Sequence, residues 1–451
     1  MSATPSNTTT EAAFEKSDGV PVEIPQSNGD LQGKLFEEGK PLEENAPSTR
    51  PQIPDFPDGG PRAWSVAIGA AGVLFTTFGY VNAFGIYQEY YQSHQLRDQT
   101  PSAISWIGSV QVFFLFGGNL VGGPLFDQYG ARTMWPAALA FLFSVMMTSL
   151  CSQYYQFMLA QGILGGFSMG MSMSPVMAAT AQYFNKNRGA AMGIAVAGSS
   201  LGGVIFPIAL SKMLNNPDLS FGWTVRIIGF LMLAVLIPSA AAIRARLPPR
   251  KGRFFIPSAF TEVKFTSLLF AVFLMMLGVF TPIFYITTYA VVHGVDVQLA
   301  SYLIAILNGM SLFGRIIPGI LADKLGALNM LCGAGICTGI LTLCWQLLDS
   351  SASIIVFAVL YGFFSGAIVS LMTVSLAHTP KDPRNIGTYM GMGMAVVAFA
   401  ALAGPPINGA LVSKYGGFTE ASIFSGVMIT VGASSVTLVK MASGKGLFAK
   451  I

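Results

Sequence analysis

The sequence predicts an all-α membrane protein in which twelve transmembrane helices form two pseudo-symmetric six-helix bundles. Three observations support this prediction. Of the 451 residues, 53% are hydrophobic and only 10% are charged, which is not the composition of a soluble protein. Twelve apolar runs have about the 20 residues that a helix needs to cross a bilayer. The first six runs recur in the second six at a constant spacing, so that Gly319 follows Gly123 by 196 residues.

The apolar runs define the domain boundaries. They lie at 65–87, 102–124, 133–151, 157–180, 188–210, 223–243, 265–290, 298–320, 328–348, 352–374, 387–409 and 419–440. Residues 61–244 are expected to form the N-terminal bundle and residues 265–440 the C-terminal bundle, with a cytoplasmic linker at 245–264 between them. The segment 441–451 is expected to be a short cytoplasmic tail.

The first 60 residues have a different composition. They are polar and rich in Pro, Ser, Thr, Glu and Asp, which is typical of a disordered tail. We expect no secretory signal peptide or lipidation motif before the first run. Basic residues concentrate in the loops after the second, fourth, sixth, eighth and tenth runs. The positive-inside rule therefore places both termini in the cytoplasm, and we expect the protein in the plasma membrane.

Two related stretches interrupt the apolar runs. GGPLFDQYGAR (122–132) follows the second run, and PGILADKLG (318–326) ends the eighth. A tight turn explains Gly130 but not Asp127. A carboxylate close to a helix end and between small residues can pair with a cation or lie at the start of a neighbouring helix. Arg188 and Arg384, at the starts of the fifth and eleventh runs, are the candidate cations. The repeated residues are Gly123, Asp127, Gly130 and Arg132 in the first stretch, and Gly319, Asp323 and Gly326 in the second.

This repeated pattern carries a resemblance to a known family. The order Gly-x-Leu-x-Asp-x-x-Gly, followed by an arginine only in the first copy, resembles the loop signature of the major facilitator superfamily. Together with the twelve runs, the resemblance covers the whole membrane body. It implies a cytoplasmic gate that holds the two halves together in the outward-facing state.

Three further stretches are similar to the monocarboxylate transporter branch of that superfamily, above all to its fungal members. They are DGGPRAW (58–64), YFNKNRGAAMGIAVAGSSLGG (183–203) and AGPPINGAL (403–411). The first of them departs from the animal pattern, which has one residue fewer between the glycine pair and the tryptophan. The fifth run lacks the Gly-Pro-x-x-Gly-Gly signature of drug–proton antiporters, which argues against that branch.

Arg315 is the one ionisable residue deep within an apolar run, where the cost of burying a charge indicates a function. Its side chain either extends to the cytoplasmic interface or faces a central cavity, where a guanidinium binds a carboxylate through two hydrogen bonds. The resemblance favours the second interpretation, because monocarboxylate transporters carry their substrate-binding arginine at this position. They also carry an aspartate one turn earlier, where this chain has Ser311, and a lysine in the first run, which is absent here.

Without that aspartate and lysine, proton symport by the usual route is in doubt. Four alternatives stay open: facilitated diffusion, exchange of one anion for another, a substrate that carries its own proton, and coupling through Glu89, Asp127 or Asp323.

Neutral groups are expected to supply selectivity. Among the amides within the runs, Asn82 and Asn308 are the preferred substrate-binding candidates, because the first and eighth spans carry the site in the resembled family. Tyr80, Phe84 and Tyr361 are the aromatic candidates, and packing within the bundle is the alternative for each of them.

The sequence therefore predicts a secondary or facilitative transporter of this superfamily, which moves a small organic acid or related metabolite by alternating access. An efflux carrier for a fungal secondary metabolite is the alternative, and a non-transporting nutrient sensor on the same fold is less favoured. No nucleotide-binding loop, metal cluster or nucleophile–base set is recognisable, so we expect neither an enzyme nor a cofactor. The expected partners are a small organic anion and membrane lipids, not nucleic acid, and the oligomeric state is left open.

Overall fold

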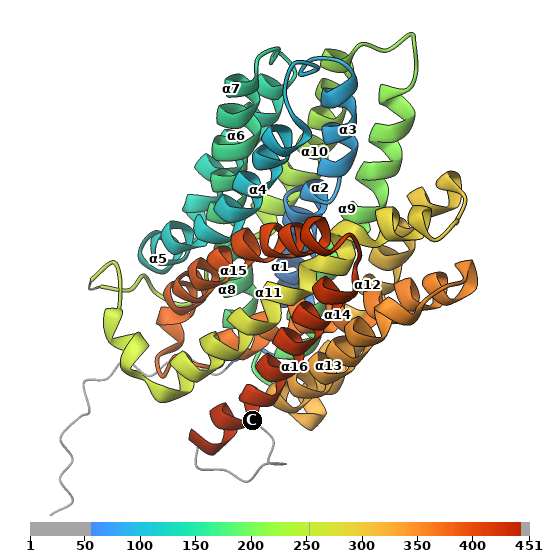
Figure 1. The fold of residues 1–451 in the computed structure, drawn as a ribbon. Coiled ribbons are helices and arrows are strands. Elements are labelled where there is room, and N and C mark those ends of the chain that lie inside the picture. Colours follow the sequence, from blue (N-terminus) through green and yellow to red (C-terminus); the bar gives the residue numbers. More distant parts are fainter. Residues whose placement is uncertain (1–55, 252, 443–451) are drawn as a thin grey trace, which may run out of the picture. The chain divides into compact units, whose positions relative to one another are not determined.

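The computed structural model describes residues 56–251 and 253–442 of the chain. Within these ranges every regular element is a helix (Figure 1). The predictions for residues 1–55 and 443–451 concern segments outside the described residues. Phe56 to Gly60, the end of the predicted tail, are described and lie directly before the first helix.

The N-terminal half forms six helical segments at the places of the first six predicted runs. Three of these segments consist of consecutive pieces, so the half has more elements than spans. The elements are α1 (Gly60–Thr76), α2 (Phe78–Val81), α3 (Phe84–Ser93), α4 (Pro101–Gly117), α5 (Asn119–Tyr129), η1 (Gly130–Thr133), α6 (Met134–Thr148), α7 (Tyr154–Phe157), the π-helix η2 (Met158–Gly165), α8 (Gly166–Tyr183), α9 (Arg188–Leu214) and α10 (Phe221–Ala242).

The C-terminal half repeats this order with more continuous helices. Its elements are η3 (Pro257–Thr261), α11 (Val263–Val292), α12 (Val297–Leu325), α13 (Ala327–Cys344), η4 (Trp345–Leu347), α14 (Ser351–Ala377), η5 (Pro383–Asn385), α15 (Ile386–Tyr415) and α16 (Thr419–Ala442). Each predicted run of this half lies within, or within a few residues of, one of the long helices.

Ten helical stretches of the described residues are long and apolar enough to cross a membrane. One of them, Pro101–Thr148, contains the second predicted run and most of the third. The fourth run, which forms α7, η2 and α8, is not among the ten. Because α8 is buried along nearly its whole length, protein rather than lipid surrounds its serines, and its composition can be more polar. The helices thus account for all twelve predicted spans.

The first span is bent where polar side chains bond to the backbone. The hydroxyls of Thr76 and Thr77 both donate to the carbonyl of Val73, at 2.9 and 2.7 Å. Asn82 donates through Nδ2 to the carbonyl of Phe78, at 3.0 Å. Such bonds compete with the regular helical pattern and bend the helix. Asn82 lies beside Gly203 of α9 and Asn308 of α12.

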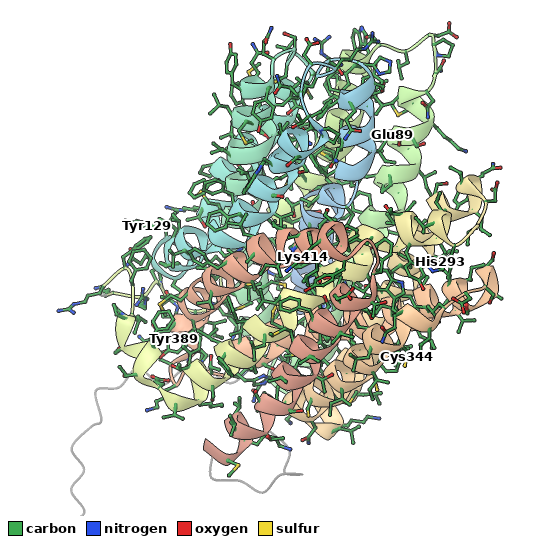
Figure 2. All side chains as sticks on the ribbon, viewed as in Figure 1. Glu89, Tyr129, His293, Cys344, Tyr389 and Lys414 are labelled. Carbon is green, nitrogen blue, oxygen red and sulfur yellow. The ribbon has the colours of Figure 1, made fainter. Side chains whose placement is uncertain are left out.

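The two halves meet along two sets of helices. Helix α9 packs along α12, and α4 and α5 pack along α15, which Figure 1 shows beside α5. We call the end of the bundle that carries the loops after α5, α8, α10, α12 and α14 the basic end. Figure 2 shows Tyr129 and Tyr389 at this end, and Glu89 and His293 at the opposite end.

Candidate functional site

Asp127 binds the start of a helix in the opposite half. It lies in the last turn of α5 and is 4% exposed. Its Oδ1 accepts the backbone N–H of Gly387 at 3.1 Å, and its Oδ2 accepts the N–H and the hydroxyl of Thr388 at 2.6 and 2.7 Å. The first N–H groups of a helix have no partner within the helix and carry its positive dipole end. Asp127 therefore caps α15 across the interface.

Asp323 makes the equivalent contact in the other direction. It lies near the end of α12, and its two carboxylate oxygens accept the backbone N–H groups of Gly189 and Ala190, at 2.7 and 2.9 Å. These N–H groups belong to the first turn of α9. Each half thus supplies one carboxylate and one helix start, and the two contacts join the halves at the basic end.

Glycines let the helix backbones touch at both contacts. A Cβ atom added to Gly123 would overlap the carbonyl oxygen of Gly387, and one added to Gly319 would lie 2.6 Å from that of Gly189. Real Cβ atoms do not approach backbone this closely, so only glycine fits. Gly130 and Gly326 have another role, since they end α5 and α12 with φ of +69° and +94°, which favour glycine.

The basic residues of the motif lie around these two contacts, and Arg188 is close enough to Asp323 for the two charges to attract each other. Arg188 is buried and donates to the carbonyls of Phe184 and Ala377, so that it ties α9 to the end of α14. Arg384 forms an ion pair with Asp382 at 2.8 Å. Arg132 is exposed. Of the two kinds of partner that the sequence left open for Asp127, the structure shows the helix start in direct contact and a cation nearby, which is Arg250 and not Arg188 or Arg384.

Arg315 lies at the interface between the halves, where α12 faces α9. It is 6% exposed and donates through Nη1 to the carbonyl of Val196, at 2.9 Å, and to the hydroxyl of Ser199. Its guanidinium carbon also lies 5.8 Å from the centre of the Phe78 ring. Its Nε is buried and bonds to no described group, and no described carboxylate pairs with it. Arg315 is thus a buried cation with unused hydrogen-bonding capacity.

Two of the predicted amides meet near this arginine. A Cβ atom added to Gly203 of α9 would lie 2.9 Å from Oδ1 of Asn308 and 3.1 Å from Nδ2 of Asn82, so the two amides converge on this glycine. Asn308 stands seven residues before Arg315, two helical turns away on the same face of α12. The structure therefore brings Asn82 and Asn308 together across the interface and aligns them with Arg315.

The predicted aromatic residues lie elsewhere. Tyr80 donates its hydroxyl to that of Tyr87 at 2.8 Å inside the N-terminal half, and Tyr361 donates to the carbonyl of Val279 at 2.6 Å inside the C-terminal half. Both are buried. Phe84 is half-buried with its ring against Gly108 of α4. None of the three is beside Arg315, and the packing alternative describes their contacts.

The groups of α9 that surround Arg315 were not among the residues expected from the sequence. Val196, Ser199 and Gly203 follow at intervals of three and four residues and so line one face of α9. Ser199 and Gly203 belong to the stretch GSSLGG (198–203), which in the sequence carries a family resemblance. Its spacing of small and polar residues is the signal that could have indicated a face in contact with another helix.

Two bundles of six membrane helices, in contact at one end through paired helix caps and with a buried cation at their interface, define a membrane transporter that alternates between two arrangements of its halves. The chain belongs to the Major Facilitator Superfamily, whose family model matches residues 66–405. It is a multi-pass membrane protein that transports a small molecule.

Relatives extend over most of the chain. The aspyridones efflux protein apdF of Emericella nidulans is 56% identical over 405 residues, which are 89% of this chain and 83% of that protein. The agnestins efflux protein AgnL12 of Paecilomyces divaricatus is 40% identical over 413 residues, 90% of this chain and 93% of that protein. The chain thus resembles fungal transporters of this superfamily.

Solved structures show the same fold at low sequence identity. The human organic anion transporter MFSD10 (TETRAN) has a TM-score of 0.68 at 15% identity, over 84% of this chain and 100% of the other. The transporter FucP in its outward conformation has a TM-score of 0.66 at 13% identity, over 84% and 99%. These similarities concern the arrangement of the helices.

Asp127→Asn and Asp323→Asn are each expected to open the basic end. Both oxygens of each carboxylate accept hydrogen bonds, so an amide must turn its NH₂ group toward one of the N–H donors. The loss of one charge-assisted bond, about 1.5–3 kcal/mol, would favour the open arrangement about 10- to 100-fold.

The distance between spin labels at Arg244→Cys and Lys381→Cys, exposed residues of the two halves at the basic end, reports this change. The four native cysteines are replaced by alanine for this purpose. Asp218→Asn, an exposed acid near the other end of α9, is the control. An unchanged distance distribution in both gate variants would contradict the capping role.

Proposed function

We propose that this chain is an efflux carrier that exports a fungal secondary metabolite with an acidic group. The observation that carries this proposal is Arg315, a buried guanidinium at the interface of the halves that no described carboxylate neutralises. An anionic group of a substrate would supply the missing charge and occupy the free donors in a planar, two-bond contact. The direction of transport is inferred from the efflux proteins apdF and AgnL12.

The amides support a substrate larger than a simple monocarboxylate. Asn82 and Asn308 each use Nδ2 to bond the carbonyl four residues earlier, at 3.0 and 3.1 Å. Their remaining capacity is suited to a hydroxyl or amide of a substrate. Asn308 and Arg315 lie about 10 Å apart along α12, at about 1.5 Å per residue. The guanidinium bonds Ser199, only four residues before the Gly203 that Asn308 approaches, so a metabolite that contacts both needs its acidic group and a second polar group within this distance of each other.

This site keeps the arginine of monocarboxylate transporters without their aspartate and lysine. We place the protein near the monocarboxylate branch because its motifs resemble that branch. We assign it a wider substrate range because the aspartate and the lysine are absent. The positive-inside rule supports a plasma-membrane orientation with both termini and the basic end in the cytoplasm. In that orientation the described arrangement is closed to the cytoplasm, and lipid surrounds the exposed apolar residues of the spans.

Proteoliposomes loaded with pairs of carboxylic acids and their primary carboxamides test the substrate class. The pairs include lactate and larger hydroxy acids, and the aspyridones and agnestins that the relatives' names give are tested beside them without carboxamide counterparts. We expect the larger acids to cross faster than their carboxamides, and protein-free liposomes give the background. Equal rates for acid and carboxamide would reject the anion site, and preference for lactate would reject the larger substrate in favour of a simple monocarboxylate.

An imposed pH gradient is expected to leave the rate of acid transport unchanged. The groups at the interface, a guanidinium and two amides, do not exchange a proton near neutral pH. At the basic end, burial raises the pKa of Asp127 to about 7, but the N–H groups of Gly387 and Thr388 hold its carboxylate in the closed arrangement, and Asp323 accepts the start of α9. Initial rates at equal and unequal pH measure this. Accumulation of the acid driven by the pH gradient would contradict this prediction. If that accumulation disappeared in Asp127→Asn or Asp323→Asn, the aspartate concerned would be the group that carries the proton.

A further inference from the structure

Asp58 reaches from the segment before α1 to the loop between α8 and α9. Its Oδ1 accepts the backbone N–H groups of Asn185, Lys186 and Asn187, at 2.5, 2.6 and 3.5 Å. The three donors are consecutive and lie directly before Arg188, the first residue of α9. One carboxylate oxygen therefore holds the whole loop, whose first donor, Asn185, lies 127 residues later in the chain.

The backbone around Asp58 is docked on the same loop. Its N–H donates to the carbonyl of Tyr183 at 3.1 Å, and its own carbonyl accepts Nδ2 of Asn187 at 3.0 Å. These bonds keep Asp58 at φ of +51°, the left-handed region that aspartate tolerates better than most residues. Two residues earlier, the Phe56 ring lies 5.6 Å from the guanidinium of Arg188 and 5.1 Å from that of Arg246.

The C-terminal half does not need such a partner for its equivalent loop. There Asp382 accepts the N–H of Arg384 at 2.9 Å and pairs with its guanidinium. The residue that stands 196 positions before Asp382 is Lys186, which has no carboxylate to offer. In the N-terminal half the carboxylate that accepts the N–H groups of this loop therefore belongs to another segment, and the residue is Asp58.

This loop determines where the gate donors point. The N–H groups of Asn185, Lys186 and Asn187 bond to Asp58, and the next donors, those of Gly189 and Ala190, bond to Asp323. Asp58 and the loop are in the same half, so their contact can persist when the halves separate. Asp323 is in the other half and must withdraw.

We propose that Asp58 is a positioning residue of the gate: it fixes the loop before α9 so that the N–H groups of Gly189 and Ala190 face Asp323, and thereby favours the arrangement closed at the basic end. The two halves then differ in the residue that fixes the loop before the capped helix. The C-terminal half uses an acid within its own loop, whereas the N-terminal half depends on the segment that leads into its first helix.

Two substitutions separate the hydrogen bonds of Asp58 from its backbone conformation and its charge. Asp58→Gly accepts the φ of +51° without strain and removes the acceptor. Asp58→Asn keeps one acceptor oxygen, which suffices because all three loop bonds use Oδ1, and removes the charge. We expect Asp58→Gly to favour the open arrangement about tenfold, and Asp58→Asn to have a smaller effect.

The spin-label pair at residues 244 and 381 measures the populations, and Asp218→Gly is the control. Asp58→Gly is also introduced together with Asp323→Ala. If Asp58 acts by positioning the donors of Asp323, the glycine substitution shifts the wild-type distribution but adds little to Asp323→Ala. The same shift in both backgrounds, or none in a folded wild-type background, would overturn the proposal. Should Asp58→Gly fail to fold, Asp58→Ser makes the same comparison, since its hydroxyl is too short to hold all three donors.

Discussion

Arg315→Ala is expected to lower the transport of acidic substrates about 100-fold, which corresponds to the loss of two charge-assisted hydrogen bonds of about 1.5 kcal/mol each. In the structure the guanidinium is buried, and no described carboxylate pairs with it. Arg315→Lys keeps a charge but loses the planar two-bond contact, so we expect an intermediate rate. Initial rates in proteoliposomes, normalised to the amount of folded transporter, measure both variants.

Arg226→Ala is the matched control for this substitution. Arg226 is a half-buried arginine of α10 whose Nε donates to the hydroxyl of Ser149 at 3.2 Å, away from the interface of the halves. Its loss should leave acid transport close to that of the wild type. Because Arg315 also bonds α9, the spin-label distances at the basic end are compared as well. A folded Arg315→Ala variant that transports acids at the normal rate would place the anion site elsewhere.

Gly123→Ala is expected to prevent the closed arrangement at the basic end. The new Cβ atom would overlap the carbonyl oxygen of Gly387, which is backbone and cannot rotate away. The halves must then separate at this contact, and Asp127, one turn later on α5, loses its partners at the start of α15. We expect long spin-label distances at the basic end and a loss of transport, since the carrier no longer alternates.

Gly117→Ala tests whether this effect comes from the close contact or from any added methyl group. Gly117 ends α4 at the same interface, but a Cβ atom there would meet only Cβ of Ala398, at 3.9 Å. That is an ordinary van der Waals distance, so the substitution should leave the distances and the rate close to those of the wild type. Similar effects of the two alanines would show that the backbone contact at Gly123 does not decide closure.

Much of the fold follows from local properties of the sequence. The length of an apolar run is set by the thickness of the bilayer, which is why the predicted runs and the helices agree within a few residues for most spans. The fourth span was also predicted, although its helix α8 contains three serines, a threonine and a glutamine. The repeat of Gly123 and Asp127 in Gly319 and Asp323 indicated a pair of equivalent contacts, which the structure shows. The function of Arg315 stays a prediction.

The contacts that make the site were decided by the tertiary structure. Asp127 bonds to Thr388, 261 residues later, and no local pattern states which of several helix starts a carboxylate meets. In the first span Asn82 lies at the interface, whereas Tyr80, two residues earlier, lies inside the N-terminal half, because two residues rotate a helix by about 200°. The sequence by itself determined the membrane body, its two halves and the residues able to form a gate; only the packing of one half against the other decided which groups meet, because those contacts depend on helix phase and long-range approach.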